Sequence, residues 1–104
     1  CWIGEQCYLH SGGGITIGRD VGIGPGVRIF TSYHAEEGIH KPIIDSRIEF
    51  KPVSIGDDSD IGAGAVIMPG VTIGRGVQIG AGAVVVRSVP SGSTVYTQPA
   101  KRLR

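Results

Sequence analysis

Residues 55–90 read as six consecutive hexapeptides: IGDDSD, IGAGAV, IMPGVT, IGRGVQ, IGAGAV and VVRSVP. Every hexapeptide opens with Ile or Val, and its fifth place holds Ser, Ala or Val. Small or turn-prone residues, suited to a left-handed backbone conformation at a corner, fill the fourth place: Asp58, Gly64, Gly70, Gly76, Gly82 and Ser88. A sustained period of six is not the spacing of an amphipathic helix, and it predicts a parallel β-helix.

A second period of 18 residues lies inside the first. Residues 17–34 repeat the pattern as IGRDVG, IGPGVR and IFTSYH, and the second place of each hexapeptide is Gly except at every third one, where it is Phe30, Met68 or Val86. Three unequal faces describe a triangular coil, so we expect coils at 17–34, 55–72 and 73–90. Ile3 and Leu9 fit two faces of an earlier coil with His10 in the bulky place, before a Ser11–Gly14 insertion that shifts the register by two.

Stacking these coils about 4.8 Å apart brings the opening aliphatic residues into three inward columns. The predicted columns are Ile17, Ile55 and Ile73; Ile23, Ile61 and Ile79; and Ile29, Ile67 and Val85. No single coil buries enough apolar surface to be stable alone, so the stack folds together. An ordinary β-sandwich is disfavoured, because it would alternate with period two over strands of varied length.

Two segments interrupt the repeat. Residues 35–54 are charged and irregular, and we expect the chain to leave a corner after His34 and return to start a new coil at Ile55. Excursions of this length in a compact domain are usually functional or disordered. We therefore predict one domain, a β-helix over 1–90 with a loop at 35–54, followed by a C-terminal tail over 91–104.

Composition supports a strand-rich, non-membrane domain. The 104 residues include 14 Ile and 11 Val but only 2 Leu, and β-branched side chains pack well on pleated sheets. A net charge of +1 gives no basic face for nucleic acid. No apolar run approaches the roughly 20 residues that cross a bilayer, and no secretory leader is visible. Only two cysteines occur, Cys1 and Cys7, which we interpret as reduced thiols in a cytoplasmic protein.

The repeat block from Pro52 to Pro90 and the tail QPAKRLR resemble the hexapeptide-repeat acyltransferases, above all the sugar O-acetyltransferases of the maltose, galactoside and polysaccharide type. This resemblance implies a left-handed β-helix, a homotrimer, and acetyl-CoA bound in a groove between adjacent subunits. The implied activity is acetyl transfer from acetyl-CoA to a hydroxyl of a sugar or another small acceptor, with no metal.

The same resemblance assigns residues. In the family a long loop leaves the helix just after a catalytic His, and the segment VRIFTSYH puts that role on His34. In the family, backbone groups on successive coils hold the pantetheine arm. By motif position, these are the backbone groups of Ala63 and Ala81. The sequence departs from the family in three places: Asp60 stands where an aromatic residue is common, Asn is absent, and Thr97 stands at the Gly place of the tail motif GxPAK, which here reads TQPAK.

The chemistry of the reaction fits a histidine. An imidazole with an ordinary pKa near 6.5 can remove the proton of a hydroxyl, which then attacks the thioester directly. We interpret His40 as solvated, and His10 as a surface residue near the substrate at most. Four carboxylates are candidates to orient His34, and the sequence does not choose among Glu36, Glu37, Asp45 and Glu49. The cations Lys101 and Arg104 either meet the 3′-phosphate of coenzyme A or are simply solvated.

Three other readings are less favoured. The position of Cys7 argues against a covalent acyl-cysteine, because it is an inward place where a thiol packs as a small hydrophobe. A non-catalytic scaffold would not need His34 or two IGAGAV hexapeptides. A zinc enzyme of carbonic-anhydrase type needs several His ligands, and residues 55–90 contain none.

Overall fold

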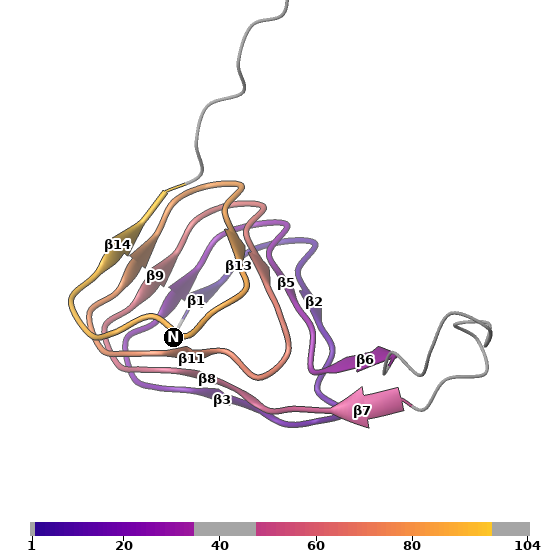
Figure 1. Cartoon of the computed structure of the whole chain (residues 1–104). Coiled ribbons are helices and arrows are strands. Elements are labelled where there is room, and N and C mark those ends of the chain that lie inside the picture. The colour runs from indigo at the N-terminus through magenta and orange to yellow at the C-terminus, as the bar shows by residue number, and fades with distance from the viewer. Residues whose placement is uncertain (1, 35–47, 97–104) are drawn as a thin grey trace, which may run out of the picture.

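The computed structural model describes residues 2–34 and 48–96, and in these ranges every regular element is a β-strand. Parallel strands stack in three sheets that form the faces of a triangular prism (Figure 1). Face one contains β1 (Trp2–Ile3), β4 (Gly22–Ile23), β9 (Asp60–Ile61), β12 (Gln78–Ile79) and β14 (Thr94–Val95). Face two contains β2 (Tyr8–Leu9), β5 (Arg28–Ile29), β10 (Val66–Ile67) and β13 (Val84–Val85). Face three contains β3 (Ile15–Ile17), β8 (Val53–Ile55) and β11 (Thr72–Ile73).

The three predicted inward columns are confirmed. Strand pairing aligns Ile17 with Ile55 and Ile73, Ile23 with Ile61 and Ile79, and Ile29 with Ile67 and Val85. The first coil also joins the stack in the expected register, because Ile3 pairs with Ile23 and Leu9 with Ile29. The fifth-place residues complete the core between the columns, and they include Ala65, Val71, Val77, Ala83 and Val89. Ser59 is the polar member of that series, and its buried hydroxyl donates to Gly74 O at 2.8 Å.

Fourth-place residues turn the corners with positive φ angles. These angles include 57° at Asp20, 60° at Asp58 and 71° at Gly64. Ser32 and Ser88 are exceptions without a positive φ. Ser32 begins the ribbon described below. The hydroxyl of Ser88 accepts a hydrogen bond from Thr72 N at 3.0 Å, and the last coil pairs with face three through the Ile73–Val89 bridge.

Second-place glycines allow the coils to stack at strand spacing. A Cβ placed on Gly62 would lie 2.5 Å from Ala81 N, and one on Gly24 would lie 2.7 Å from Ala63 N. Such contacts are closer than real Cβ atoms allow, and the opposing atoms are backbone that cannot turn aside. Glycine is therefore required at these places because any side chain would collide with the backbone of the next coil, and not because of the φ angle of the glycine itself.

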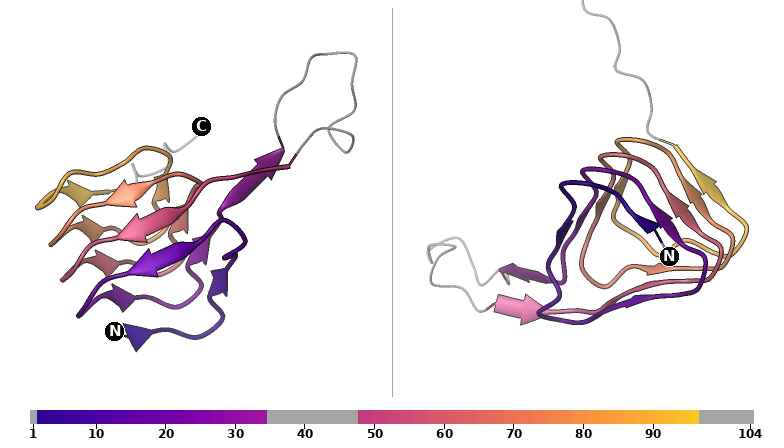
Figure 2. Two further views of the ribbon diagram at one scale, coloured as in Figure 1. Left: turned by 90° about the horizontal axis from the view of Figure 1, so that it is seen from below. Right: turned by 180° about the vertical axis from the view of Figure 1, so that it is seen from behind.

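The excursion leaves the prism earlier than expected. We expect departure after His34, whereas the chain leaves at Ser32 and forms an antiparallel ribbon from β6 (Ser32–His34) and β7 (Ile48–Phe50) (Figure 2). Ser32 pairs with Phe50, and His34 with Ile48. Tyr33, the fifth residue of its hexapeptide, therefore lies in the ribbon and not in the core. The chain leaves the coil directly after Thr31, whose side chain is fully buried in a polar network described below.

The coil continues beyond Pro90, where the repeat is expected to end. Gly92 has a φ of 79°, and β14 pairs in parallel with β12 through Thr94 and Val95. The described chain contains no helix of the length and hydropathy needed to cross a membrane. Cys7 is a free thiol that packs against the core and lies 3.2 Å from Gly24 O, to which it donates. Cys1 falls outside the described residues, and a cytoplasmic location stays a prediction.

The inward register can be tested with two substitutions in one coil. We expect Ile61→Asp to lower the free energy of unfolding by more than about 4 kcal/mol, because it removes a buried side chain and inserts an unpaired carboxylate. Asp58→Gly should change it by less than about 1 kcal/mol, since glycine adopts a φ of 60° readily. Chemical denaturation measures both, and equal midpoints for the two variants would contradict the register.

Candidate active site

The ribbon formed by β6 and β7 projects from the corner between face two and face three (Figures 1 and 2). His34 is the last residue of β6, two positions beyond the foot of the ribbon, and its backbone pairs with that of Ile48. The chain positions its predicted base on a paired strand that projects away from the prism. The side chain of His34 lies outside the described residues, as does all of His40.

A buried threonine fixes the foot of the ribbon. Thr31 Oγ1 donates to His10 O at 2.6 Å, accepts from Gly13 N at 2.8 Å, and lies 3.2 Å from His10 Nδ1. Lys51 N donates to Thr31 O at 2.9 Å where the second strand of the ribbon returns to the prism. This network ties the Ser11–Gly14 insertion, the first coil and both ends of the excursion to one residue.

Aromatic rings surround this foot. Tyr8 lies nearly parallel to His10, with ring centroids 6.3 Å apart, and its centroid lies 5.6 Å from that of Phe30. Phe50 and His10 flank Gly12, since a Cβ there would lie 3.0 Å and 3.3 Å from their Cε1 atoms. Tyr8 is 51% exposed and Phe50 is 56% exposed. The result is an accessible aromatic surface beside the point where the ribbon begins.

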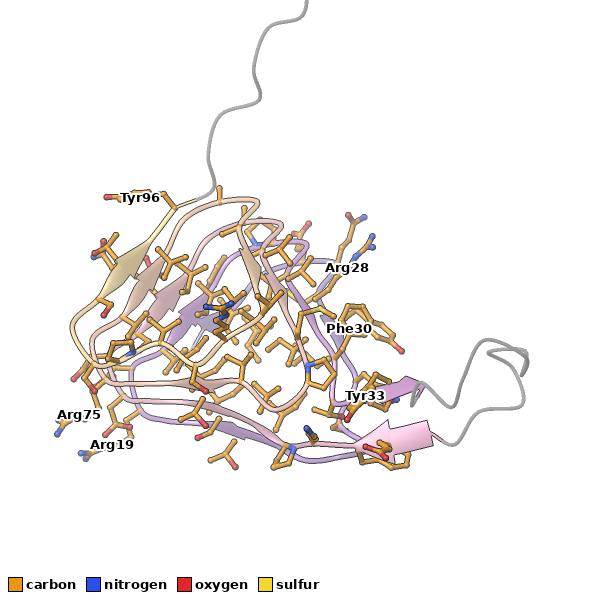
Figure 3. All side chains as sticks on the ribbon, in the orientation of Figure 1. Arg19, Arg28, Phe30, Tyr33, Arg75 and Tyr96 are labelled. Atoms are coloured by element: carbon orange, nitrogen blue, oxygen red, sulfur yellow. The ribbon has the colours of Figure 1, made fainter. Side chains whose placement is uncertain are left out.

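Polar contacts brace the ribbon itself. Tyr33 Oη donates to Glu49 Oε2 at 2.8 Å, and the ammonium of Lys51 lies 5.6 Å from the centroid of the Tyr33 ring (Figure 3). Glu49 is one of the four carboxylates considered as partners of His34, and the structure engages it with Tyr33. The other three, Glu36, Glu37 and Asp45, fall outside the described residues.

Ala63 and Ala81 stand on a different corner, between face one and face two. Each follows a glycine in a turn of type II geometry, in which Ala65 N donates to Gly62 O and Ala83 N to Gly80 O, both at 3.2 Å. Gly82 N donates to Ala63 O at 2.9 Å, so the two turns are stacked one coil apart. Both alanines are exposed. The structure therefore brings together the two residues that the sequence assigns to the pantetheine arm.

The backbone N–H groups of Ala63 and Ala81 have no acceptor among the described residues. At the corner between faces three and one, Arg19 N donates to Asp57 Oδ1 at 2.8 Å and Arg75 N to Ser91 Oγ at 2.9 Å. The side chain of the next coil caps those donors. Ala81 has no acceptor atom with which to cap Ala63. The alanine in IGAG thus leaves a backbone donor free on an exposed corner.

Tyr96 is a further residue at this corner that the repeat does not indicate. Its ring lies over Gly80, because a Cβ there would be 3.3 Å from its Cδ1, and the side chain is 77% exposed (Figure 3). The only sequence signal is an aromatic residue just before the tail motif. Lys101 and Arg104, the predicted partners of the 3′-phosphate, lie outside the described residues.

The two candidate regions occupy opposite edges of face two. The ribbon leaves the corner shared with face three, whereas Ala63 and Ala81 lie on the corner shared with face one (Figure 1). One chain therefore does not bring the strand that carries His34 next to the free N–H groups. No cluster of three His, Cys, Asp or Glu side chains suited to a metal occurs among the residues described.

Comparisons with known proteins agree with this geometry. Residues 52–87 match the model of the family described as bacterial transferase hexapeptide (six repeats). This block therefore carries the hexapeptide repeats of that family. The fold of the chain is the left-handed parallel β-helix predicted from the resemblance, with triangular coils and a projecting loop.

Three proteins illustrate what this hexapeptide-repeat chain is similar to. Nodulation protein L of Rhizobium leguminosarum bv. viciae is 46% identical over 96% of this chain and 52% of its own length. A hexapeptide-repeat containing acetyltransferase from Vibrio cholerae, solved with acetyl coenzyme A, is 34% identical with a TM-score of 0.78, covering 98% of this chain and 58% of its own. A maltose O-acetyltransferase from Clostridium difficile 630 is 28% identical with a TM-score of 0.66, covering 94% and 65%. The chain spans about half the length of the curated relatives it matches.

Proposed function

We propose that this chain transfers an acetyl group from acetyl-CoA to a hydroxyl of a sugar or another small acceptor. The observation that carries the proposal is the pair of free N–H donors at Ala63 and Ala81, one coil apart on an exposed corner with small side chains. A pantetheine arm is long, narrow and carries amide carbonyls that need donors. The relative from Vibrio cholerae, solved with acetyl coenzyme A, supports the choice of acyl donor.

His34 is the proposed general base. Its imidazole takes the proton of the acceptor hydroxyl while the hydroxyl oxygen bonds to the thioester carbon. The carbon–sulfur bond then breaks, and the imidazolium returns its proton to the sulfur of coenzyme A. Atoms and charge balance without a metal or a covalent enzyme intermediate. A backbone N–H or a side chain of the neighbouring subunit stabilises the oxyanion that forms between these steps.

The active form is proposed to be a homotrimer in which two chains share each site. The outward places of face two are mostly apolar, with Val84 59% exposed and Val86 64% exposed. Outward places on face three are polar, as Thr16, Ser54 and Thr72 illustrate. Burying the part of face two around Val84 and Val86 against a second copy removes this apolar surface from water and brings the ribbon of one chain to the alanine corner of the next.

Replacing His34 tests the chemistry. We expect His34→Ala to lower turnover with acetyl-CoA by about 10²–10⁴-fold, the usual loss for a general base, without lowering the melting temperature or acetyl-CoA affinity. His40→Ala is the matched control and should cost much less. Turnover of maltose and methyl β-galactopyranoside, with calorimetry for acetyl-CoA, measures both effects. Wild-type turnover by His34→Ala would contradict the assignment, and absence of acetyl-CoA binding by the wild type would favour a scaffold.

Proline can remove the proposed backbone donor without disturbing the turn. Ala81→Pro converts IGAG into IGPG, which the chain already uses at residues 23–26 in the same corner. The second residue of a type II turn accepts proline, and Ala81 N makes no hydrogen bond to any residue of 2–34 or 48–96. We expect an unchanged melting temperature and an acetyl-CoA dissociation constant raised about three- to tenfold. Ala81→Ser keeps the N–H and should bind as the wild type does. Equal affinities for the proline and serine variants would contradict the donor role.

Mixing variants tests whether two chains share a site. His34→Ala and an Ala63→Pro/Ala81→Pro double variant should each be weak at low acetyl-CoA. After unfolding and refolding together, mixed trimers contain sites with His34 from one chain and both alanines from the other. We therefore expect activity above the sum of the separate samples, and light scattering should give three times the chain mass. A monomer at micromolar concentration, or a mixture with no gain, would contradict the shared site.

A further inference from the structure

The contact between His10 and Thr31 determines which imidazole nitrogen carries the proton. A hydroxyl has one proton and two lone pairs. The proton of Thr31 Oγ1 goes to His10 O at 2.6 Å, and one lone pair accepts Gly13 N–H at 2.8 Å. Only a lone pair remains for His10 Nδ1 at 3.2 Å. Nδ1 must therefore be the donor, and in the neutral ring Nε2 is left as a hydrogen-bond acceptor.

His10 Nε2 is free and reachable. It makes no hydrogen bond to any described residue, and the described residues include no buried side-chain nitrogen or oxygen that lacks a partner. Nε2 is consequently open to solvent. Thr31 holds the opposite edge of the ring and is itself fully buried in the coil. The acceptor lone pair is thus presented from a rigid element, as binding groups in preorganised sites are.

Apolar surface lies beside this acceptor. Tyr8 stacks near His10, and Phe50 and His10 both lie beside Gly12. Both aromatic rings are more than half exposed. An acceptor atom close to exposed aromatic rings suits a ligand with a flat C–H face and hydroxyl donors at its rim, which is the chemistry of a sugar ring.

We propose that His10 Nε2 accepts a hydrogen bond from a hydroxyl of the acyl acceptor, one other than the hydroxyl being acetylated, while the acceptor ring packs against Tyr8 and Phe50. This assignment rests on the proposed function and adds a specificity-determining residue to it. His10 takes no proton from the reacting group, which is the role of His34. It orients the acceptor at the foot of the ribbon.

Nitrogen-15 NMR of the imidazole tests the first step directly. At a pH where the ring is neutral, we expect a protonated Nδ1 and an unprotonated Nε2 for His10. Thr31→Ser keeps the hydroxyl and should preserve this tautomer, whereas Thr31→Val removes the acceptor that holds it. A neutral His10 with its proton on Nε2 in the wild type would overturn the proposal, because that nitrogen would then donate rather than accept.

Two isosteric variants separate a binding role from a structural one. Asn places its amide near Nδ1, so His10→Asn keeps a donor for Thr31 but has nothing at the position of Nε2. Gln reaches the position of Nε2 with an amide oxygen, so His10→Gln restores an acceptor there. We expect His10→Asn to raise KM for the acceptor about three- to tenfold with a smaller change in kcat, and His10→Gln to recover part of the loss. A structural role predicts the reverse order.

The outcomes distinguish this proposal from the function on which it rests. The measurement uses whichever of maltose and methyl β-galactopyranoside has the higher kcat/KM. A His10→Asn variant with wild-type acceptor KM, in an enzyme that His34→Ala inactivates, overturns the role of His10 and leaves the proposed function intact. Failure of the wild type to acetylate either sugar overturns both. An unchanged KM for acetyl-CoA in both His10 variants is expected, because His10 is proposed to bind the acceptor and the backbone of Ala63 and Ala81 to bind acetyl-CoA.

Discussion

The close approach of one coil to the next is the constraint on which the rest of the structure depends. At the second place of a hexapeptide, the backbone of the following coil lies where a side chain would begin. A Cβ on Gly62, for example, would be only 2.5 Å from Ala81 N. Only glycine permits that approach, which occurs at the corners that follow face three and face one, and it lets the ladders of backbone hydrogen bonds run from coil to coil at strand spacing. The ladder then holds the aliphatic residues in register, so that Ile23, Ile61 and Ile79 form one column. Each hexapeptide is stable only because the coils on either side of it make the same backbone and core contacts.

The same constraint decides what each corner presents to solvent. A third-place residue exposes its N–H towards the side chain of the coil above. Where that side chain has an oxygen, as Asp57 and Ser91 do, the donor is capped. Where it is a methyl group, as at Ala81, the donor stays free. A single position in the repeat thus converts a structural corner into a row of hydrogen-bond donors, and function enters the β-helix without altering its core.

A second break in the repeat lies at Thr31, where the excursion begins. The Thr31 hydroxyl bonds to His10 O and Gly13 N, and the chain leaves the coil as a ribbon at Ser32. The insertion in the first coil supplies the other half of that network. Two irregular segments therefore stabilise each other at one corner, where they also gather the exposed rings of Tyr8 and Phe50. The two breaks in the repeat thus bring together side chains that regular stacking of the coils would not place side by side.

The sequence alone determined the coil phase, the inward columns, the corner glycines and the resemblance that names His34, Ala63 and Ala81. These follow from contacts at a constant separation along the chain, so a period of 18 residues encodes them. Tertiary structure decided where the ribbon leaves, that the coil continues to Val95, and that His10 meets Thr31. That contact spans 21 residues rather than 18, because the insertion adds two residues to the spacing and Thr31 lies one place beyond Phe30, the residue aligned with His10. It also decided that the ribbon and the alanine corner lie on opposite edges of face two. The repeat period predicts which residues stack on one another. Contacts between the irregular segments depend instead on the path that each segment takes away from the prism, which the period does not contain.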